Sequence, residues 1–299
     1  MDTTSKAEAL LATSNLVDVG VQGDDVRRRM HGARTTFVRV FEVHVEAPVP
    51  TRPAGLSAGE VRIVGRPASE AAATGVVRAA SALADGAPLT GFSLADLYAL
   101  APDPDALAEL CSRLHDAGLE AIADTPLDSH RLEDVPTAVR AARDAGLGVW
   151  RLTLHALPTG LSSELNPAQR SELINAARIA SVERARDLQA AVGGFRAFAP
   201  LPRTMSIATP TTGYDDVKQV ALARMVVNNI DSIQVDWPLY GPKLAQVALT
   251  VGADDVDGIA AVDPGVLGTR RSPIEEIRGN IRAAALEAVE RDGRFRLLT

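Results

Sequence analysis

The sequence predicts an α/β fold, a full or partial (β/α) barrel of the TIM type. Short apolar runs of strand character alternate with helical segments along most of the chain, a pattern typical of parallel sheets. Glycines such as Gly118 and Gly146 directly follow several helical segments, where the left-handed conformation ends a helix. With 299 residues, 46% of them apolar, the chain can build one large core. We expect a helical arm over residues 1–35 and a barrel domain over residues 36–299 that includes a C-terminal helical tail.

The first two expected strands lie close together in the sequence. Residues 36–45 are apolar nearly throughout, as in a buried parallel strand, and residues 60–65 form the second strand. About 14 residues separate them, although a parallel crossover usually needs a dozen or more and contains a helix. Three prolines in this connection argue against a helix of any length. We therefore expect a crossover without a helix between the first two strands.

The middle of the chain alternates regularly between helix and strand. Strands are expected at residues 87–92, 119–123, 149–155 and 195–201. Helices are expected at residues 68–84, 104–117, 135–145 and 166–192. The last of these has a capping residue, Asn166, followed by Pro167, which favours the first helical position.

Residues 209–258 form the most distinctive stretch. An amphipathic helix is followed by a strand at residues 233–237 and by a helix that opens at Gly241. A glycine-bounded loop at residues 252–258 then carries three acidic residues, which are Asp254, Asp255 and Asp257. A loop just past a strand-helix unit faces the ligand in α/β barrels. A last helix is expected at residues 273–289.

Four ordered motifs in this stretch carry a family resemblance. They are the T-T-G-x-D-D sequence at Thr211, the strand ending in Trp237, the G-x-K-L-A-Q helix at Gly241 and the G-A-D-D-x-D-G segment at Gly252. Together they resemble the C-terminal half of aminofutalosine synthase-like radical SAM enzymes, which belong to the futalosine route to menaquinone. The resemblance implies a barrel of the radical SAM kind. Our candidates for binding a small-molecule ligand are Arg151, Arg196, Thr211, Thr212, Asp236, Trp237, Tyr240, Asp254 and Asp255.

The N-terminal half departs from the family pattern. The resemblance implies a C-x-x-x-C-x-x-C loop after the first strand, whose thiolates hold a [4Fe-4S] cluster, but residues 46–59 contain no cysteine. The one cysteine, Cys111, falls on the apolar stripe of a helix. Arg66 stands where the resemblance implies a glycine that helps to seat the amino group of SAM. We therefore expect no cofactor, neither SAM nor a [4Fe-4S] cluster, and no metal ion.

The candidate catalytic residues are polar side chains on strands or at strand ends, where barrel sites are built. Glu42 and His44 are two residues apart, so both point to one face of the first strand. Asp124 and His155 close their strands. Structural roles remain open for all four, an ion pair for Glu42 and His44 above all. The acids of residues 254–257 can bind a cation or ribose hydroxyls, or serve as turn residues.

Composition and missing motifs exclude several classes of protein. A net charge of −7 offers no basic footprint for nucleic acid, and no run of about 18 apolar residues indicates a membrane span. The first residues lack the pattern of a secretory signal, and a single cysteine fits the cytoplasm. The sequence contains no P-loop, dinucleotide fingerprint, H-E-x-x-H or C-x-x-C motif. We expect a cytoplasmic protein without a nucleic-acid partner.

Three functions remain open. The first is a catalytically degenerate paralogue, a pseudoenzyme that keeps a small-molecule pocket and acts as a non-radical partner or regulator. It would form a homo-oligomer, or a hetero-oligomer with an active family member. The second is a cluster-independent enzyme that performs acid-base chemistry on a small metabolite. The third is a radical SAM-type transferase of menaquinone biosynthesis whose cluster ligands come from a partner chain. The first accounts for both the retained C-terminal motifs and the missing cysteines.

Overall fold

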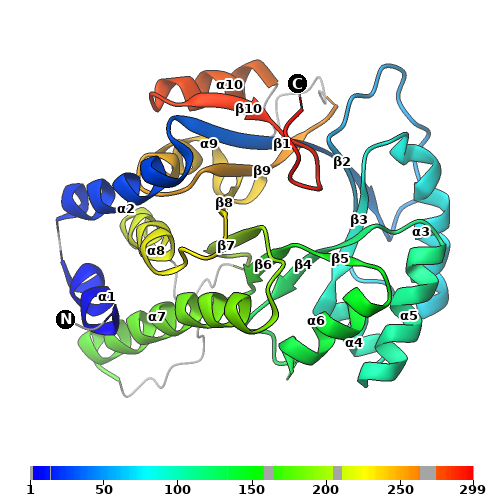
Figure 1. Ribbon diagram of the computed structural model, residues 1–299, viewed down its shortest axis with the longest axis horizontal. Coiled ribbons are helices and arrows are strands. Elements are labelled where there is room, and N and C mark those ends of the chain that lie inside the picture. Colours follow the sequence, from blue (N-terminus) through cyan, green and yellow to red (C-terminus); the bar gives the residue numbers. More distant parts are fainter. Residues whose placement is uncertain are drawn as a thin grey trace.

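The protein folds as a closed barrel of parallel strands surrounded by helices (Figure 1). The computed structural model describes residues 3–13, 15–132, 134–157, 165–204, 211–262 and 274–298. β1 (Arg34–His44) pairs with β2 (Glu60–Val64) on one side and with β9 (Asp255–Ala260) on the other, which closes the ring. Between them follow β3 (Leu89–Ser93), β4 (Ala121–Pro126), β6 (Arg151–Leu154), β7 (Ala197–Pro202) and β8 (Ser232–Asp236). The predicted TIM-type barrel is confirmed, as a full barrel of eight strands.

Two short strands lie outside this ring. β5 (Gly148–Val149) extends the pairing of β4, and Trp150 separates it from β6. β10 (Glu287–Glu290) pairs with the first residues of β1, from Arg34 to Phe37. The connection between β1 and β2 contains no helix, as its prolines predict.

The outer ring consists of helices that follow the strands in the expected order. They are α3 (Glu70–Ala84), α4 (Leu94–Leu100), α5 (Pro104–Asp116), α6 (Val135–Asp144), α7 (Pro167–Val192), α8 (Gly213–Val226), α9 (Trp237–Leu249) and α10 (Ile274–Ala283). Side chains cap many of them: Asp103 accepts a hydrogen bond from the backbone N–H of Ala106, and Asn166 forms a capping box with Gln169. None of the described helices is long and apolar enough to cross a membrane.

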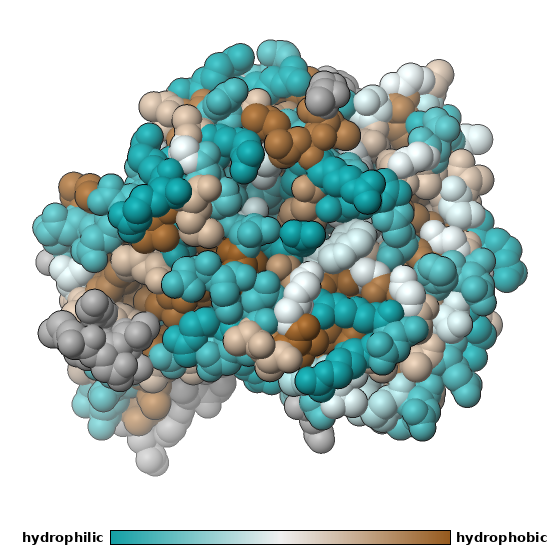
Figure 2. Space-filling model, viewed as in Figure 1, coloured by the Kyte–Doolittle hydropathy of each residue, from teal (hydrophilic) through white to brown (hydrophobic). Residues whose placement is uncertain are grey.

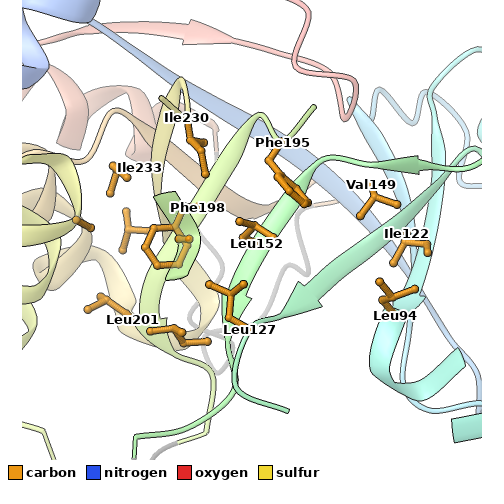
Figure 3. Close-up of a cluster of buried hydrophobic side chains, with 14 of the residues drawn as sticks. Leu94, Ile122, Leu127, Val149, Leu152, Phe195, Phe198, Leu201, Ile230 and Ile233 are labelled. Atoms are coloured by element: carbon orange, nitrogen blue, oxygen red, sulfur yellow. The ribbon is translucent and has the colours of Figure 1, made fainter. Parts of the chain in front are cut away.

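The hydrophobic core lies between the barrel and the helices. Leu152, Phe198 and Ile233 are register partners on β6, β7 and β8, so they share the outer face of the sheet, where all three are buried (Figure 3). Hydrophilic residues cover most of the molecular face seen in Figure 2, with apolar residues in small patches between them. Because the apolar side chains face outward from the barrel, the polar residues of the same strands face its interior.

Two N-terminal helices pack against the barrel's outer ring. α1 (Thr3–Ala12) and α2 (Leu16–His31) both lie beside α8 (Figure 1). Gly23 of α2 approaches the chain after α9 so closely that a Cβ there would lie 2.0 Å from the carbonyl oxygen of Val251. The division into an arm of residues 1–35 and a barrel of residues 36–299 stays a prediction.

Two expected elements differ from the structure. The segment at residues 252–258 is mostly strand β9 and not a loop, because Asp255 and Asp257 point into the barrel, where arginines pair with them. The last helix ends at Ala283 and not at residue 289, because the chain turns at Ala285 (φ 58°) and pairs as β10 with β1. Pro273, the expected start of that helix, lies outside the described residues.

Candidate functional site

The barrel interior is filled by paired charges. Asp257 of β9 accepts two hydrogen bonds of 2.8 Å from the guanidinium group of Arg62 on β2, and a third from Arg151 on β6. Glu60 accepts two further bonds from Arg62, at 2.7 and 2.9 Å. Each of these side chains is almost fully buried. Bidentate arginine-carboxylate pairs of this kind are stronger than neutral hydrogen bonds and fix both partners in place.

A second set of charges closes the N-terminal end of the barrel. Arg291, just after β10, donates two hydrogen bonds of 2.6 Å to Asp255. Gln234 donates to the same carboxylate at 2.7 Å, and Thr36 donates to it as well. The guanidinium carbon of Arg291 lies 4.1 Å from the centre of the Phe295 ring. The segment after β10 therefore covers this end of the barrel.

The pKa values of the interior groups follow from this pairing. Burial works against the charge of Asp257, but Arg151 and Arg62 hold the pKa of its carboxyl group well below the usual value. Burial also opposes the charge of Glu60, whose pKa is nonetheless lowered by Arg62. Burial opposes the charge of Arg62 too, yet Asp257 and Glu60 raise its pKa well above the usual value. The interior is thus a set of ionised, mutually compensated groups.

A cavity of about 500 Å³ opens above this interior, at the C-terminal ends of β2, β3, β4, β6 and β7. This is the end at which barrel proteins build their sites. Apolar residues such as Ile63 and Phe92 form part of its wall. Its charged lining comprises five arginines and two aspartates, which are Arg62, Arg66, Arg131, Arg151, Arg203, Asp96 and Asp124. We call this cavity the mouth pocket. The excess of guanidinium groups favours an anionic ligand with an apolar body.

Arg203 links two strand ends at the mouth pocket. Its Nη1 lies 3.3 Å from a carboxylate oxygen of Asp236, and its Nε lies 3.9 Å from Asp124. Asp236 also accepts a 3.0 Å hydrogen bond from the backbone N–H of Leu239 and so caps α9. Burial raises the pKa of Asp236, while Arg203 opposes that rise. Arg203 therefore holds the carboxylates of Asp124 and Asp236 close together at the ends of β4 and β8.

The four candidate catalytic residues divide into two pairs. Asp124 and His155 both line the mouth pocket. Glu42 and His44 face each other at 3.7 Å, with 60% of the His44 side chain exposed, and neither contributes to the lining of that pocket. The structure thus brings together Asp124 and His155 with Arg203, which sequence reasoning missed.

The candidate ligand-binding residues near the mouth are Arg151, Asp236 and Tyr240. Arg151 reaches the floor of the mouth pocket. Tyr240 donates its hydroxyl hydrogen to the carbonyl of Pro202, and burial raises the pKa of this hydroxyl. Trp237, which follows Asp236 in the sequence, is fully buried. Its indole Nε1 has no hydrogen-bond partner among the described residues.

The other candidates lie elsewhere. Thr212 caps α8 through a box with Asp215, and Thr211 donates to Asp216 at 3.4 Å. Arg196 is exposed before β7, at the opposite end of the barrel from the mouth pocket, where it pairs with Asp231.

Two acidic candidates serve as partners of arginines. Asp254 is buried before β9, where it accepts hydrogen bonds from Arg224 and from the backbone N–H of Ile233. Asp255 lies in the barrel interior with Arg291. The described residues contain no group of three or more His, Cys, Asp or Glu side chains that could hold a metal ion.

One residue of the pocket lining could have been predicted from the sequence. Arg62 interrupts the apolar run of β2 between Val61 and Ile63, and a charged residue inside such a run needs a buried partner. Arg131 and Arg203 lie after β4 and β7, and nothing local marks them.

A comparison with family models matches residues 196–297 to the CofH/MqnC C-terminal region. Among curated proteins, aminodeoxyfutalosine synthase of Thermus thermophilus is 28% identical in an alignment 207 residues long, which covers 63% of this chain and 54% of that protein. Cyclic dehypoxanthine futalosine synthase of Streptomyces coelicolor is 29% identical over 50% of this chain and 39% of its own length. The chain thus spans about half, or less, of the length of these relatives. The resemblance to the aminofutalosine synthase-like radical SAM family is confirmed.

Two solved structures share the fold. Methylornithine synthase (PylB) aligns with a TM-score of 0.64 at 12% identity, covering 95% of this chain and 93% of its own. HydG, a maturase of the [FeFe]-hydrogenase, aligns with a TM-score of 0.60 at 15% identity, covering 95% of this chain and 71% of its own. At these identities the likeness concerns the barrel and not the activity.

The comparisons contradict the prediction that no cofactor, neither SAM nor a [4Fe-4S] cluster, belongs with this chain. Its relatives and structural neighbours are radical SAM enzymes, which use both groups. The single thiol of this chain cannot supply the several thiolates that such a cluster requires. Residues 45–59, between β1 and β2, contain no cysteine, and Cys111 is buried in α5, where burial raises the pKa of its thiol to about 12. SAM and iron-sulfur reconstitution therefore belong in any test of ligand binding.

Proposed function

We propose that this chain is a ligand-binding paralogue of the aminofutalosine synthase-like enzymes. In this proposal it binds a small anionic metabolite in the mouth pocket and acts as a partner or regulator of an active family member in menaquinone biosynthesis. The observation that carries the proposal is the arginine-rich cavity of about 500 Å³ above a fully paired interior. The connection at residues 45–59, which lacks cysteine, supports a role other than starting radical chemistry with its own thiols.

The pairing below the mouth pocket supports binding at the mouth. Arg62 and Arg151 already share Asp257, so a ligand meets a rigid floor whose charges are compensated. Arg203 stands at the wall, held by Asp124 and Asp236, with its side chain partly exposed. A preorganised floor with an adjustable wall lowers the entropy lost when a small ligand binds.

Thermal unfolding in the presence of candidate metabolites tests the proposal. The ligands are an enolpyruvyl benzoate, futalosine-like nucleosides and SAM, the last with and without anaerobic iron-sulfur reconstitution. A ligand at a hundredfold excess over its Kd stabilises the native state by about 2.7 kcal/mol, which for a chain of 299 residues is a rise in Tm of roughly 4 °C. We expect this rise with an anionic pathway metabolite, and its loss in Arg203→Met.

Arg196→Met is the matched control, since Arg196 is likewise paired with an aspartate, Asp231, but lies at the opposite end of the barrel. It should keep the full shift. Equal loss in both variants, or no shift with any pathway metabolite, would contradict the proposal. A cluster that forms on reconstitution and turns over SAM would replace it with the third function, a radical SAM-type transferase.

A second candidate function is acid-base catalysis on a small metabolite. It is favoured by Asp124, His155 and Arg203, which line one pocket, and by the pairing of Arg203 with Asp236. Turnover of a metabolite that shifts Tm, abolished in Asp124→Asn without loss of binding, would identify this activity. Binding without turnover in the wild-type protein would leave the first function standing.

A further inference from the structure

We propose that Arg66, Asp96 and Arg131 form an anion-binding subsite at one edge of the mouth pocket, which takes a carboxylate or phosphate group of the ligand. We call these three residues the rim cluster. Arg66 follows β2, Asp96 lies on α4, and Arg131 follows β4, and all three line the mouth pocket. The inference rests on the proposed function, because it concerns the ligand of the same pocket.

The rim cluster carries one net positive charge. A single oxygen of Asp96 lies 3.0 Å from Nη1 of Arg131 and 3.7 Å from Nε of Arg66. Neither arginine has a second carboxylate partner among the described residues. Two guanidinium groups thus share one carboxylate, which leaves donor N–H groups of both unused at the edge of a cavity.

The other arginines of the pocket are committed elsewhere. Arg62 is held by two buried acids, Arg151 shares Asp257 with it, and Arg203 lies between two aspartates. Burial separates the two groups as well, because the side chains of Arg66 and Arg131 are 51% and 42% exposed whereas that of Arg62 is 8% exposed. The rim cluster is therefore the part of the lining where positive charge is both in excess and free to reorient.

The chemistry of the cluster suits an oxyanion. Exposed ion pairs contribute little to stability, so an incoming oxyanion can replace Asp96 between the two arginines at small cost. Planar guanidinium groups then offer forked N–H donors that match the oxygens of a carboxylate or phosphate. Asp96 acts in this arrangement as a stand-in for the ligand, which holds the arginines in place while the subsite is empty.

Calorimetric titration of the full chain with benzoate, phenyl phosphate and neutral benzamide tests the subsite. We expect both anions to bind at least tenfold more tightly than benzamide. The double variant Arg66→Gln/Arg131→Gln should lose at least tenfold in affinity for the anions and nothing for benzamide. Asp96→Asn should bind the anions several-fold more tightly, since it removes the competing carboxylate. A preference for phenyl phosphate over benzoate would identify the group as phosphate, and the reverse as carboxylate.

Arg113→Gln is the control, because Arg113 is 46% exposed and pairs with Glu70 outside the pocket. It should bind the anions like wild type. Unchanged anion affinity in the double variant, or weaker binding in Asp96→Asn, would overturn the rim cluster. If the anions bind and Arg203→Met alone abolishes binding, the proposed function stands and the rim cluster fails. If the wild-type protein binds neither these anions nor any pathway metabolite, both fail.

Discussion

Asp257 holds the barrel interior together at the scale of single residues. It accepts hydrogen bonds from Arg62 and Arg151, and its own side chain is almost fully buried. Removing one partner of a buried ion pair leaves the remaining charges uncompensated, at a cost of about 3–5 kcal/mol. Asp257→Asn should therefore lower the free energy of unfolding by roughly that amount in urea titrations.

Asp231→Asn is the control for this prediction. Asp231 pairs with Arg196, but both side chains are mostly exposed, so its loss should change stability by less than about 1 kcal/mol. A similar small loss in Asp257→Asn would mean that the interior arginines find other partners.

Asp216 of α8 predicts a pH dependence of stability. Burial raises its pKa to about 6, against the opposing effects of Thr211 and Arg178, while Asp215 adds to the rise. The native state thus binds more protons than the unfolded chain between about pH 4 and 6, so this group makes the protein more stable as pH falls through that range. Asp216→Asn should remove this dependence and stabilise the protein at pH 7–8, by on the order of 1–2 kcal/mol. Unfolding free energies of both proteins at pH 4.5, 6 and 7.5 provide the measurement.

The acidic candidates show what the sequence could and could not predict at this scale. The acids of residues 254–257 stood out in the sequence, and the structure places them on or beside a barrel strand. Their arginine partners lie 30 or more positions away, as Arg224 does for Asp254 and Arg291 does for Asp255. A pairing over such distances follows from barrel closure, which local spacing does not encode.

Two glycines test the packing of whole helices. A Cβ at Gly23 of α2 would meet the backbone of Val251 at 2.0 Å, whereas one at Gly75 of α3 would meet nothing within 4 Å. Gly23→Ala should displace α2 from the backbone of Val251 and lower the free energy of unfolding by more than about 2 kcal/mol. Gly75→Ala should instead stabilise by about 0.5–1 kcal/mol, because alanine favours the helix interior. A harmless Gly23→Ala would show that α2 packs only loosely on the barrel.

Helices and strands with strong local patterns were predictable from the sequence. The expected strand at residues 233–237 matches β8, and the helix expected after Asn166 matches α7. The prediction of one continuous strand at residues 149–155 was wrong in detail, since Trp150 separates β5 from β6. The strand β10 was missed because its four residues follow a helix without a strong stop signal, and its pairing with β1 is decided by tertiary structure.

At the scale of the whole molecule, we expect acid to unfold the protein by protonating the buried carboxylates of the barrel interior. The pKa values of Glu60 and Asp257 are lowered in the native state, so their contribution to stability is present above the unfolded value near pH 4 and is lost as pH falls below it. Circular dichroism from pH 5 to 2 should show cooperative loss of structure below about pH 4. Asp257→Asn, measured alongside, should show a shallower fall of stability with pH, and an equally steep one would assign acid unfolding to other groups.

Barrel closure has a consequence for synthesis on the ribosome. Thr36 of β1 bonds to Asp255 of β9, 219 positions later, and β1 also pairs with β10. At about 5–20 residues per second, the nascent chain carries β1 for roughly 10–45 s before its partner emerges. During that time the apolar side chains that the finished barrel buries on this strand remain uncovered, among them Phe37, Val40 and Val43. Exposed apolar surface of this kind is what chaperones bind. The speed at which the message between these two strands is translated therefore sets how long the first strand must be protected.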